Sequence, residues 1–455
     1  MEACIDSPTV DNSFSYHVSR TLNLALPVML GRAGILVLVV VDSAMTGHAG
    51  AVELAYYAIA MAPQVLMILI GIGLLLGTIV LTARAEGAGH SQECGAIWRV
   101  SLLHAVVYGA TFMLLCQGGE WFLRLTGQTK DLARGGGVVL IMLGWSIPAM
   151  LLYTTTTLFL EGINRPLPGM VVMFLANLLN AALNWLFIYG NWGLPALGAE
   201  GAALATTLVR WFMFLALAGF VLIYIDRHRY NISGPIGSIC EWGRRLRHIG
   251  YPIGLSQGLE SSAFSAMTLF AGLLGPVQVA AYQIAMTLVA LVFMCALGFS
   301  TAASVRVANA VGRDDPQGLS LAGWVAVGLA VLMLGVFGGI FYSVPGPLAA
   351  VYSNDPAVTV VATAAIATAA LVLVPDGVQA VLMGALRGAA DVWPATLLYL
   401  LSFWLVMIPL GYVLGVVYEG GAPALLIAVS GACGMAAGLL AARFYIVAKR
   451  ANGCY

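Results

Sequence analysis

Apolar runs of about 20 residues or more follow one another along nearly the whole chain, bounded by glycine, proline or charged residues. Helices of that length cross a bilayer, and the runs are too long for the strands of a membrane barrel. Because backbone amides in lipid must be satisfied within each segment, helices are the only plausible structure. We predict an all-α polytopic membrane protein with twelve transmembrane helices, at residues 21–46, 52–80, 96–117, 136–159, 167–190, 198–225, 247–274, 277–305, 318–344, 357–385, 392–416 and 422–447.

The composition supports this class. Of 455 residues, 61% are hydrophobic and 9% are charged, which is more apolar surface than a soluble protein of this size can bury. The seven cysteines lie far apart with no metal-binding spacing, so neither a disulfide framework nor a metal centre is predicted. The first twenty residues contain Glu2, Asp6 and Asp11 against Arg20 alone. That charge is wrong for a cleaved signal peptide, and we expect the first span to remain.

The loop charges predict the orientation. With the N-terminus inside, the inner segments hold fifteen Lys and Arg residues and the outer loops hold three. Cytoplasmic loops are the ones enriched in Lys and Arg, so both termini are predicted to be cytoplasmic. The inner set is Arg20, Arg84, Arg99, Arg165, Arg227, Arg229, Arg244, Arg245, Arg247, Arg306, Arg313, Arg387, Arg443, Lys449 and Arg450, and the outer set is Arg124, Lys130 and Arg134.

An internal repeat relates the two halves of the chain. GHAGAVELAYYAIAM resembles GLLGPVQVAAYQIAM 225 residues later, and the same shift places Pro27 on Pro252 and Gly87 on Gly312. LEGINRP parallels LRGAADVWP at a shift of 226. Six spans, an even number, separate the copies. The halves are therefore predicted to be parallel repeats around a central cavity, which is a transporter architecture. The alternative is an old duplication with a functionless interface.

The predicted domains follow from the repeat and the spans. They are a cytoplasmic N-terminal segment (1–20), an N-terminal six-helix lobe (21–225), a basic cytoplasmic linker (226–246), a C-terminal six-helix lobe (247–447) and a cytoplasmic tail (448–455).

Three acidic residues lie within predicted spans: Asp42, Glu260 and Asp376. Burying an ionisable group in hydrocarbon costs at least ~2.5–3.5 kcal/mol, so such residues normally face a cavity or a partner. The spans also contain Arg32 and Arg210, which can neutralise at most two of the three acids. We therefore predict that these carboxyl groups exchange a proton or Na⁺.

Polar uncharged residues gather in the same half as Asp42. NLLNAALN places Asn177, Asn180 and Asn184 on one stripe of a helix, and we favour Asn177 and Asn180 as cavity-facing. The alternative role for these amides is helix–helix contact. Phe293 could present its ring face to a cation, although a lone Phe in a membrane helix is usually core.

Several activities are excluded or disfavoured. The chain has two lysines and no GxxxxGK[ST] loop, so it is not an ATP-driven pump. It has no zinc-protease motif and no GxSxG elbow, and no enzyme activity is predicted. An intramembrane aspartyl protease is the sharpest enzymatic alternative, but such enzymes carry YD and GxGD motifs, whereas the contexts here are VVDSAM and VPDGVQ.

Six motifs occur in a characteristic order along the chain: VDSAMTGHAG, GIGLLLG, LEGINRP, GAEGAALAT, GYPIGLSQGLESSAF and GALRGAADVWP. Together they resemble a multidrug and toxin extrusion (MATE) transporter over residues 20–450. The NorM-like bacterial branch is indicated because Glu260 and Asp376 match its acidic residues in spans 7 and 10, alongside Asp42 in span 1.

The resemblance implies a V-shaped pair of six-helix bundles in the bacterial inner membrane. It implies export of amphipathic organic cations and drugs in exchange for Na⁺ or H⁺, without ATP, a cofactor or nucleic acid, and with no metal beyond Na⁺ at the acids. The expected partners are small organic cations and membrane lipids, and the expected state is a monomer. The resemblance also supports a role for Phe293 as an aromatic residue at the cation site.

One residue departs from this pattern. Arg32 stands where relatives often have an uncharged polar residue, and it could repel a cation or pair with Glu260 across the bundle interface. Two alternative functions stay open, a lipid-linked precursor flippase of the wider superfamily and a dedicated exporter of one natural product.

Overall fold

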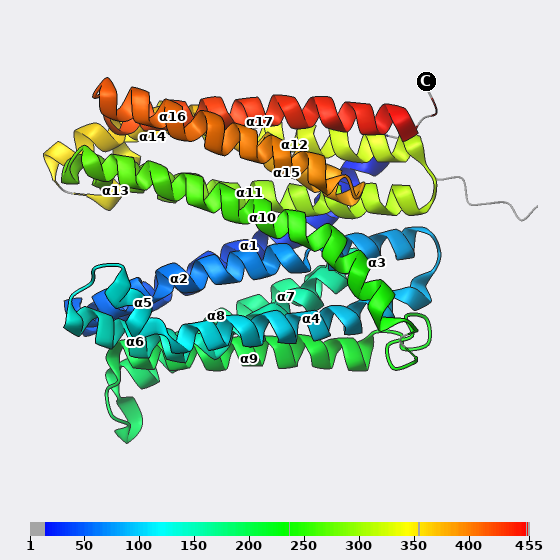
Figure 1. Ribbon diagram of the computed structural model, residues 1–455, viewed down its shortest axis with the longest axis horizontal. Helices are drawn as coiled ribbons and strands as arrows, with labels where there is room; N and C mark the ends of the chain where they lie inside the picture. The colour runs from blue at the N-terminus through cyan, green and yellow to red at the C-terminus, as the bar shows by residue number, and fades with distance from the viewer. Residues whose placement is uncertain (1–13, 236, 354, 452, 454–455) are drawn as a thin grey trace, which may run out of the picture.

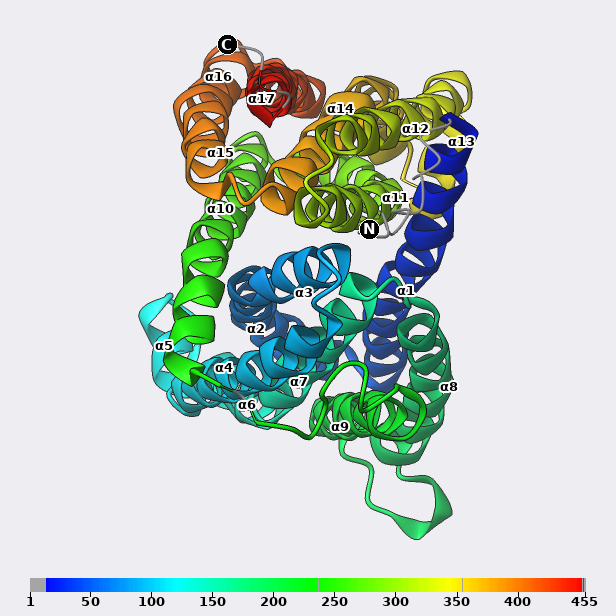
Figure 2. The same ribbon diagram turned by 90° about the vertical axis from the view of Figure 1, so that its right-hand side faces the viewer.

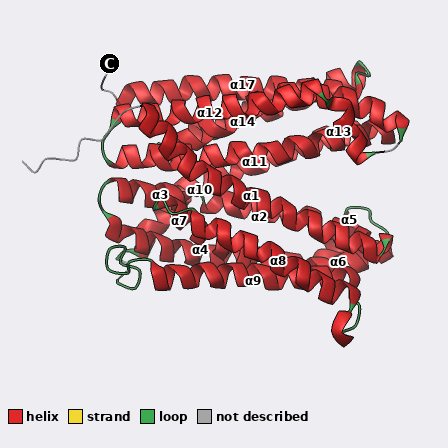
Figure 3. Ribbon diagram, turned by 180° about the vertical axis from the view of Figure 1, so that it is seen from behind, coloured by secondary structure: helices red, strands yellow, loops and turns green. Residues whose placement is uncertain are grey.

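The structure, a computed structural model, describes residues 14–235, 237–353, 355–451 and 453. These residues form helices joined by short loops and no strand, which confirms the predicted all-α class (Figure 3). The long helices run side by side along the molecule (Figure 1). They are α1 (Phe14–Ala49), α2 (Ala51–Leu75) continued by α3 (Gly77–Gly87), α4 (Ser91–Gln117), α6 (Lys130–Gly144) continued by α7 (Ser146–Gly162), α8 (Leu167–Tyr189), α9 (Gly198–Tyr224), α10 (Ile239–Leu273), α11 (Pro276–Gly312), α12 (Pro316–Ser343), α14 (Pro356–Gly388), α15 (Val392–Tyr399) continued through η2 (Leu400–Met407), α16 (Ile408–Gly411) and η3 (Tyr412–Val417), and α17 (Gly421–Ala451).

Shorter elements lie in the loops: α5 (Gly119–Leu125), η1 (Asn191–Gly193) and α13 (Pro345–Tyr352). The predicted span at 392–416 contains two π-helical stretches, η2 and η3, which apolar periodicity alone does not reveal.

Among the described residues, eleven of the long helices are apolar enough to cross a membrane by length and composition. The remaining expected span, 247–274, corresponds to the greater part of α10, which has 35 residues but is not among the eleven. Its central sequence SQGLESS is polar, and its first turns carry several arginines. A membrane helix with this composition must face protein or a polar cavity along much of its length.

Two bundles are visible when the molecule is viewed along its helices (Figure 2). We call α1–α9 the first bundle and α10–α17 the second. α1 and α10 join them: α1 packs against α11 and α12 before it reaches α8, and α10 packs against α2, α3 and α4 as well as α15. These two helices are repeat partners, since Pro27 of α1 corresponds to Pro252 of α10.

The bundles meet at one end of the molecule. We call it the arginine-rich end, because the start of α1, the end of α17 and most of the arginines lie there. Figure 1 shows the helices of the two bundles in contact at this end and diverging toward the opposite end.

Glycines allow the closest approach between the bundles. A Cβ atom added at Gly87 of α3 would lie 2.3 Å from the carbonyl oxygen of Asn309 in α11. A Cβ atom at Gly312 of α11 would lie 2.2 Å from the carbonyl oxygen of Arg84 in α3. Both residues of the first contact correspond to those of the second through the 225-residue shift. The contact is therefore isologous, as at a twofold interface between identical subunits.

The 225-residue shift also relates a second pair of close contacts between the bundles. A Cβ atom at Gly73 of α2 would lie 2.7 Å from Cα of Gly254 in α10, and one at Gly298 of α11 would lie 2.3 Å from Cγ of Met29 in α1. Residues 73 and 298 are repeat partners, and so are 29 and 254. The predicted repeat thus determines which backbones touch.

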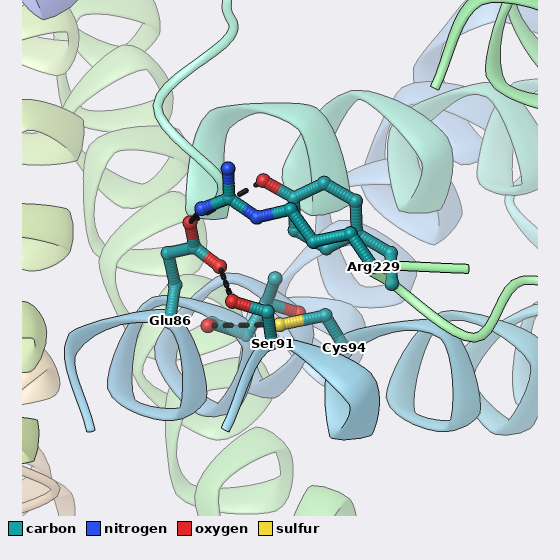
Figure 4. A network of polar contacts seen from close by, with 6 residues as sticks. Glu86, Ser91, Cys94 and Arg229 are labelled. Carbon is teal, nitrogen blue, oxygen red and sulfur yellow. Dashed lines mark hydrogen bonds and ion pairs between the residues drawn. The ribbon is translucent and has the colours of Figure 1, made fainter. Parts of the chain in front are cut away.

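The connection between the bundles is fixed to the first bundle. Glu86 accepts hydrogen bonds from Arg229 (2.8 Å) and Ser91 (2.7 Å), as Figure 4 shows. Arg99 of α4 donates to the carbonyl oxygen of Asn231 at 3.2 Å. Backbone N–H groups of Arg229 and His228 hold the pKa of the Asp226 carboxyl below its usual range. The predicted linker, 226–246, is partly helical, because α10 begins at Ile239.

We predict that Gly87→Ala and Gly312→Ala each lower the free energy of unfolding by about 1–3 kcal/mol, because the added methyl group meets backbone that cannot move aside. Unfolding in detergent, followed by tryptophan fluorescence, measures the effect. Gly335→Ala in α12 is the control, since a Cβ atom there meets nothing within 4 Å and alanine favours a helix. Equal effects of all three substitutions would contradict the prediction.

Candidate functional site

Asp42 lies in the first bundle, where its side chain is 2% exposed. Its carboxylate accepts hydrogen bonds from Tyr57 of α2 (2.9 Å), Asn184 of α8 (2.6 Å) and Thr206 of α9 (2.9 Å). Three helices thus supply donors to one acid of α1. This arrangement is what an ionised carboxylate needs in a site with little water.

The three asparagines of α8 have different roles. Asn184 donates to Asp42 and also to Oδ1 of Asn180 at 3.1 Å, and the side chain of Asn180 also interacts with the carboxyl group of Asp42. Asn177 instead donates to the carbonyl oxygen of Gly34 in α1 at 3.1 Å, which is a helix–helix contact. The structure therefore places Asn184 and Asn180, rather than Asn177, beside Asp42.

Arg210 of α9 also belongs to this site. It interacts electrostatically with Asp42 and Tyr57, and it donates to the hydroxyl group of Ser146 at 2.6 Å. Gln64 of α2 donates to the same hydroxyl group at 3.1 Å. The first-bundle acid thus has both a cation and several hydrogen-bond donors around it.

The second bundle holds a pair of acids. Gln379 of α14 donates to Asp376 at 3.1 Å and, more weakly, to Glu260 of α10 at 3.5 Å. The hydroxyl group of Tyr399 donates to the amide oxygen of Gln379, and the thiol of Cys433 lies 3.6 Å from Asp376. Glu260 and Asp376 are close enough to repel each other when both are charged. No arginine or lysine of the described chain forms an ion pair with either acid.

The predicted partner of Glu260 lies elsewhere. Arg32 lines a small cavity with Tyr153 and Glu161 of α7, and it interacts electrostatically with both. Among the described residues Arg32 forms no ion pair, so it does not pair with Glu260. Arg387 of α14 also acts on Glu161 across the bundle interface.

Phe293 is half-buried in α11 and packs against the core of the bundle. No described contact joins it to Glu260 or Asp376.

Tyr57 was missed by sequence reasoning although it lies in the repeated motif. Its repeat partner, Tyr282, is 1% exposed, and its hydroxyl group has no hydrogen-bond partner among the described residues. Tyr282 lacks an acceptor because Met267 stands at the repeat position of Asp42. Comparison of the two copies could have identified Tyr57 as the donor to the acid. Gln379, Tyr399 and Cys433 had no comparable sequence signal.

Comparison with known proteins decides the family. The sequence model of the MatE family matches residues 27–186 and 252–413, two segments whose starts are 225 residues apart. The chain belongs to the MATE family. Its members are multi-pass membrane transporters rather than enzymes, and the resemblance and fold predicted from the sequence are confirmed.

Curated relatives cover most of this MATE chain. It is 37% identical over 424 residues to a probable multidrug resistance protein NorM of Caulobacter vibrioides, covering 93% of this chain and 90% of the relative. A probable NorM of Bradyrhizobium diazoefficiens is 33% identical over 442 residues, covering 95% of this chain and 94% of the relative.

Solved structures share the fold. The eukaryotic MATE transporter AtDTX14 has a TM-score of 0.88 at 19% identity, covering 97% of this chain and 99% of that one. An outward-facing MATE multidrug resistance transporter has a TM-score of 0.87 at 20% identity, covering 96% of each chain.

We predict that Tyr57→Phe destabilises this MATE protein by about 1–3 kcal/mol, since it removes one of the hydrogen bonds to the buried carboxyl group of Asp42. Tyr282→Phe is the matched control. It removes a buried hydroxyl group that lacks a partner and should be neutral or stabilising. Chemical unfolding of the purified variants in mixed micelles measures both changes. A greater loss for Tyr282→Phe than for Tyr57→Phe would contradict the assignment of Tyr57.

Proposed function

We propose that this protein is a secondary-active multidrug efflux antiporter that exports amphipathic organic cations in exchange for Na⁺ or H⁺. The observation that carries the proposal is the pair Glu260 and Asp376, two acids within a membrane bundle that share the amide of Gln379. Neither acid forms an ion pair with a described residue. The MATE fold and the multidrug resistance names of the relatives support it.

The second-bundle pair is the proposed site of the coupling ion. Two neighbouring carboxylates in a low-dielectric environment cannot both remain charged unless a cation or a proton joins them. Asp42 differs, because it accepts hydrogen bonds from three side chains and interacts with Arg210. An ion arriving from outside therefore gains more at Glu260 and Asp376 than at Asp42.

Asp42 is the proposed negative charge that attracts the organic cation in the first bundle. Asn180 is its neighbour through Asn184. Asn177 contributes by fixing α8 against α1. Phe293 is proposed to offer a ring face to the substrate when the bundles move.

The proposed transport cycle uses the two bundles as moving lobes. The N-terminal lobe is α1–α9, the C-terminal lobe is α10–α17, and the arginine-rich end is proposed to be cytoplasmic because Lys and Arg are retained on that side. With the bundles joined at this end, we propose that the structure corresponds to an outward-facing state. Ion binding that favours one state over the other drives the exchange.

The protein is proposed to reside as a monomer in a bacterial inner membrane, with both termini cytoplasmic. The bacterial relatives support this location.

Efflux of a fluorescent organic cation from vesicles, driven by an imposed Na⁺ or H⁺ gradient, tests the proposal. We expect Glu260→Gln and Asp376→Asn to abolish the response to the gradient, because a neutral side chain does not exchange an ion. Asp42→Asn should reduce efflux about tenfold or more by removing the charge that attracts the substrate, a change of ~1.4 kcal/mol.

Glu200→Gln is the control for these substitutions, since Glu200 is an exposed carboxylate in the first turn of α9 whose side chain forms no hydrogen bond or ion pair with a described residue of either site. If all three acid variants transport at the wild-type rate under both gradients while Glu200→Gln does the same, the proposed mechanism is wrong.

A further inference from the structure

A second cavity, separate from both acidic sites, lies between the bundles at the arginine-rich end. Its volume is about 330 Å³, which lies at the lower end of the range of roughly 300–1,000 Å³ for small-molecule sites. Helices of both bundles form its walls: α1 and α3 from the first, and α11 and the start of α12 from the second.

Three arginines line this cavity: Arg20, Arg306 and Arg313. The described residues form five ion pairs, and none of the three arginines takes part in any of them. Arg20 lies over the ring of Tyr16, with the guanidinium carbon 5.4 Å from the ring centre, which leaves its charge without an anionic partner among the described residues.

Arg306 is the buried member of this group, with 9% of its surface exposed. It donates to the carbonyl oxygen of His17 at 2.9 Å, to the hydroxyl group of Thr21 at 2.5 Å and to Nδ1 of the His17 ring. These acceptors are neutral, so they satisfy its N–H groups without balancing its charge. A buried charge without a counter-charge is unfavourable, and an anion in the cavity would balance it.

The acidic side chains near the cavity interact with groups other than the three arginines. Glu86 is the carboxylate in the cavity wall, and it pairs with Arg229 and accepts from Ser91 outside the wall (Figure 4). Asp315 precedes α12, and its carboxylate caps that helix by accepting from the backbone N–H of Gly318 at 2.8 Å. Neither acid forms an ion pair with the three arginines.

Neutral donors complete the wall. The side chains of Asn23 and Asn309 line the cavity, and no described residue forms a hydrogen bond with either amide. Guanidinium and amide N–H groups that line the same cavity are typical of sites for phosphate oxygens.

We propose that this cavity binds a phosphate-type oxyanion, held by Arg20, Arg306 and Arg313. The phosphate group belongs either to an anionic lipid of the adjacent leaflet or to a soluble phosphate. Basic pockets between helix ends at a membrane surface are suited to lipid headgroups. Because both bundles contribute to the wall, the anion binds best when they are joined at this end, and it stabilises the joined state.

The test measures thermal unfolding of the full-length protein, which does not depend on transport. In detergent, sodium phosphate is titrated against sodium chloride at equal ionic strength. In nanodiscs, phosphatidylcholine alone is compared with phosphatidylcholine plus phosphatidylglycerol. Wild type is compared with Arg20→Gln/Arg313→Gln, which changes two exposed side chains and spares the buried Arg306. The control is Arg244→Gln/Arg450→Gln, which removes the same charge from the same end outside the cavity.

We expect saturable stabilisation of wild type and of the control, with an affinity at least about tenfold weaker in Arg20→Gln/Arg313→Gln. A response to phosphate alone identifies a soluble anion, and a response to phosphatidylglycerol alone identifies a lipid headgroup. The proposal fails if neither probe stabilises wild type, or if both double variants respond as wild type does. It also fails if wild type responds only after residues 2–11, which include Glu2, Asp6 and Asp11, are deleted, since the chain would then supply its own anion.

Discussion

Close contact between the backbones of α3 and α11 at the arginine-rich end is the constraint on which the arrangement of the bundles depends. Gly87 packs against the backbone at Asn309, and Gly312 packs against the backbone at Arg84. Any larger side chain at either position would separate the bundles where they are joined. The remaining features, including the crossing of α1 and α10 and the cavity lined by arginines, are arranged around this contact.

The two bundles share a backbone plan but differ in their charges. Asp42 is surrounded by donors from three helices and has Arg210 nearby. Glu260 and Asp376 share one amide and repel each other. A single scaffold can thus hold one acid that accepts hydrogen bonds from three helices and one pair of acids that shares a single amide. Such a division of roles fits exchange between an ion and a second cation.

Much of the fold could be predicted from the sequence, because bilayer thickness determines the length of apolar runs and the repeat determines how the halves are related. The contacts of individual side chains could not be predicted. α10 carries the polar stretch SQGLESS and several arginines, so apolar composition alone does not mark it as a span. Spacing along α8 could not show that Asn184 faces Asp42 while Asn177 faces the backbone at Gly34. Residues that meet from distant helices, such as Arg32 and Glu161, have no signal in a single sequence.

The isologous contact has a consequence for how this chain could diverge. In a dimer of identical six-helix subunits, every substitution would occur twice, so an acid introduced in one subunit would also appear in the other. In a single chain each copy changes alone. Asp42 has Met267 as its counterpart, and Tyr282 retains a hydroxyl group for which that counterpart offers no acceptor. Covalent fusion is thus what permits two symmetric halves to carry unlike chemistry.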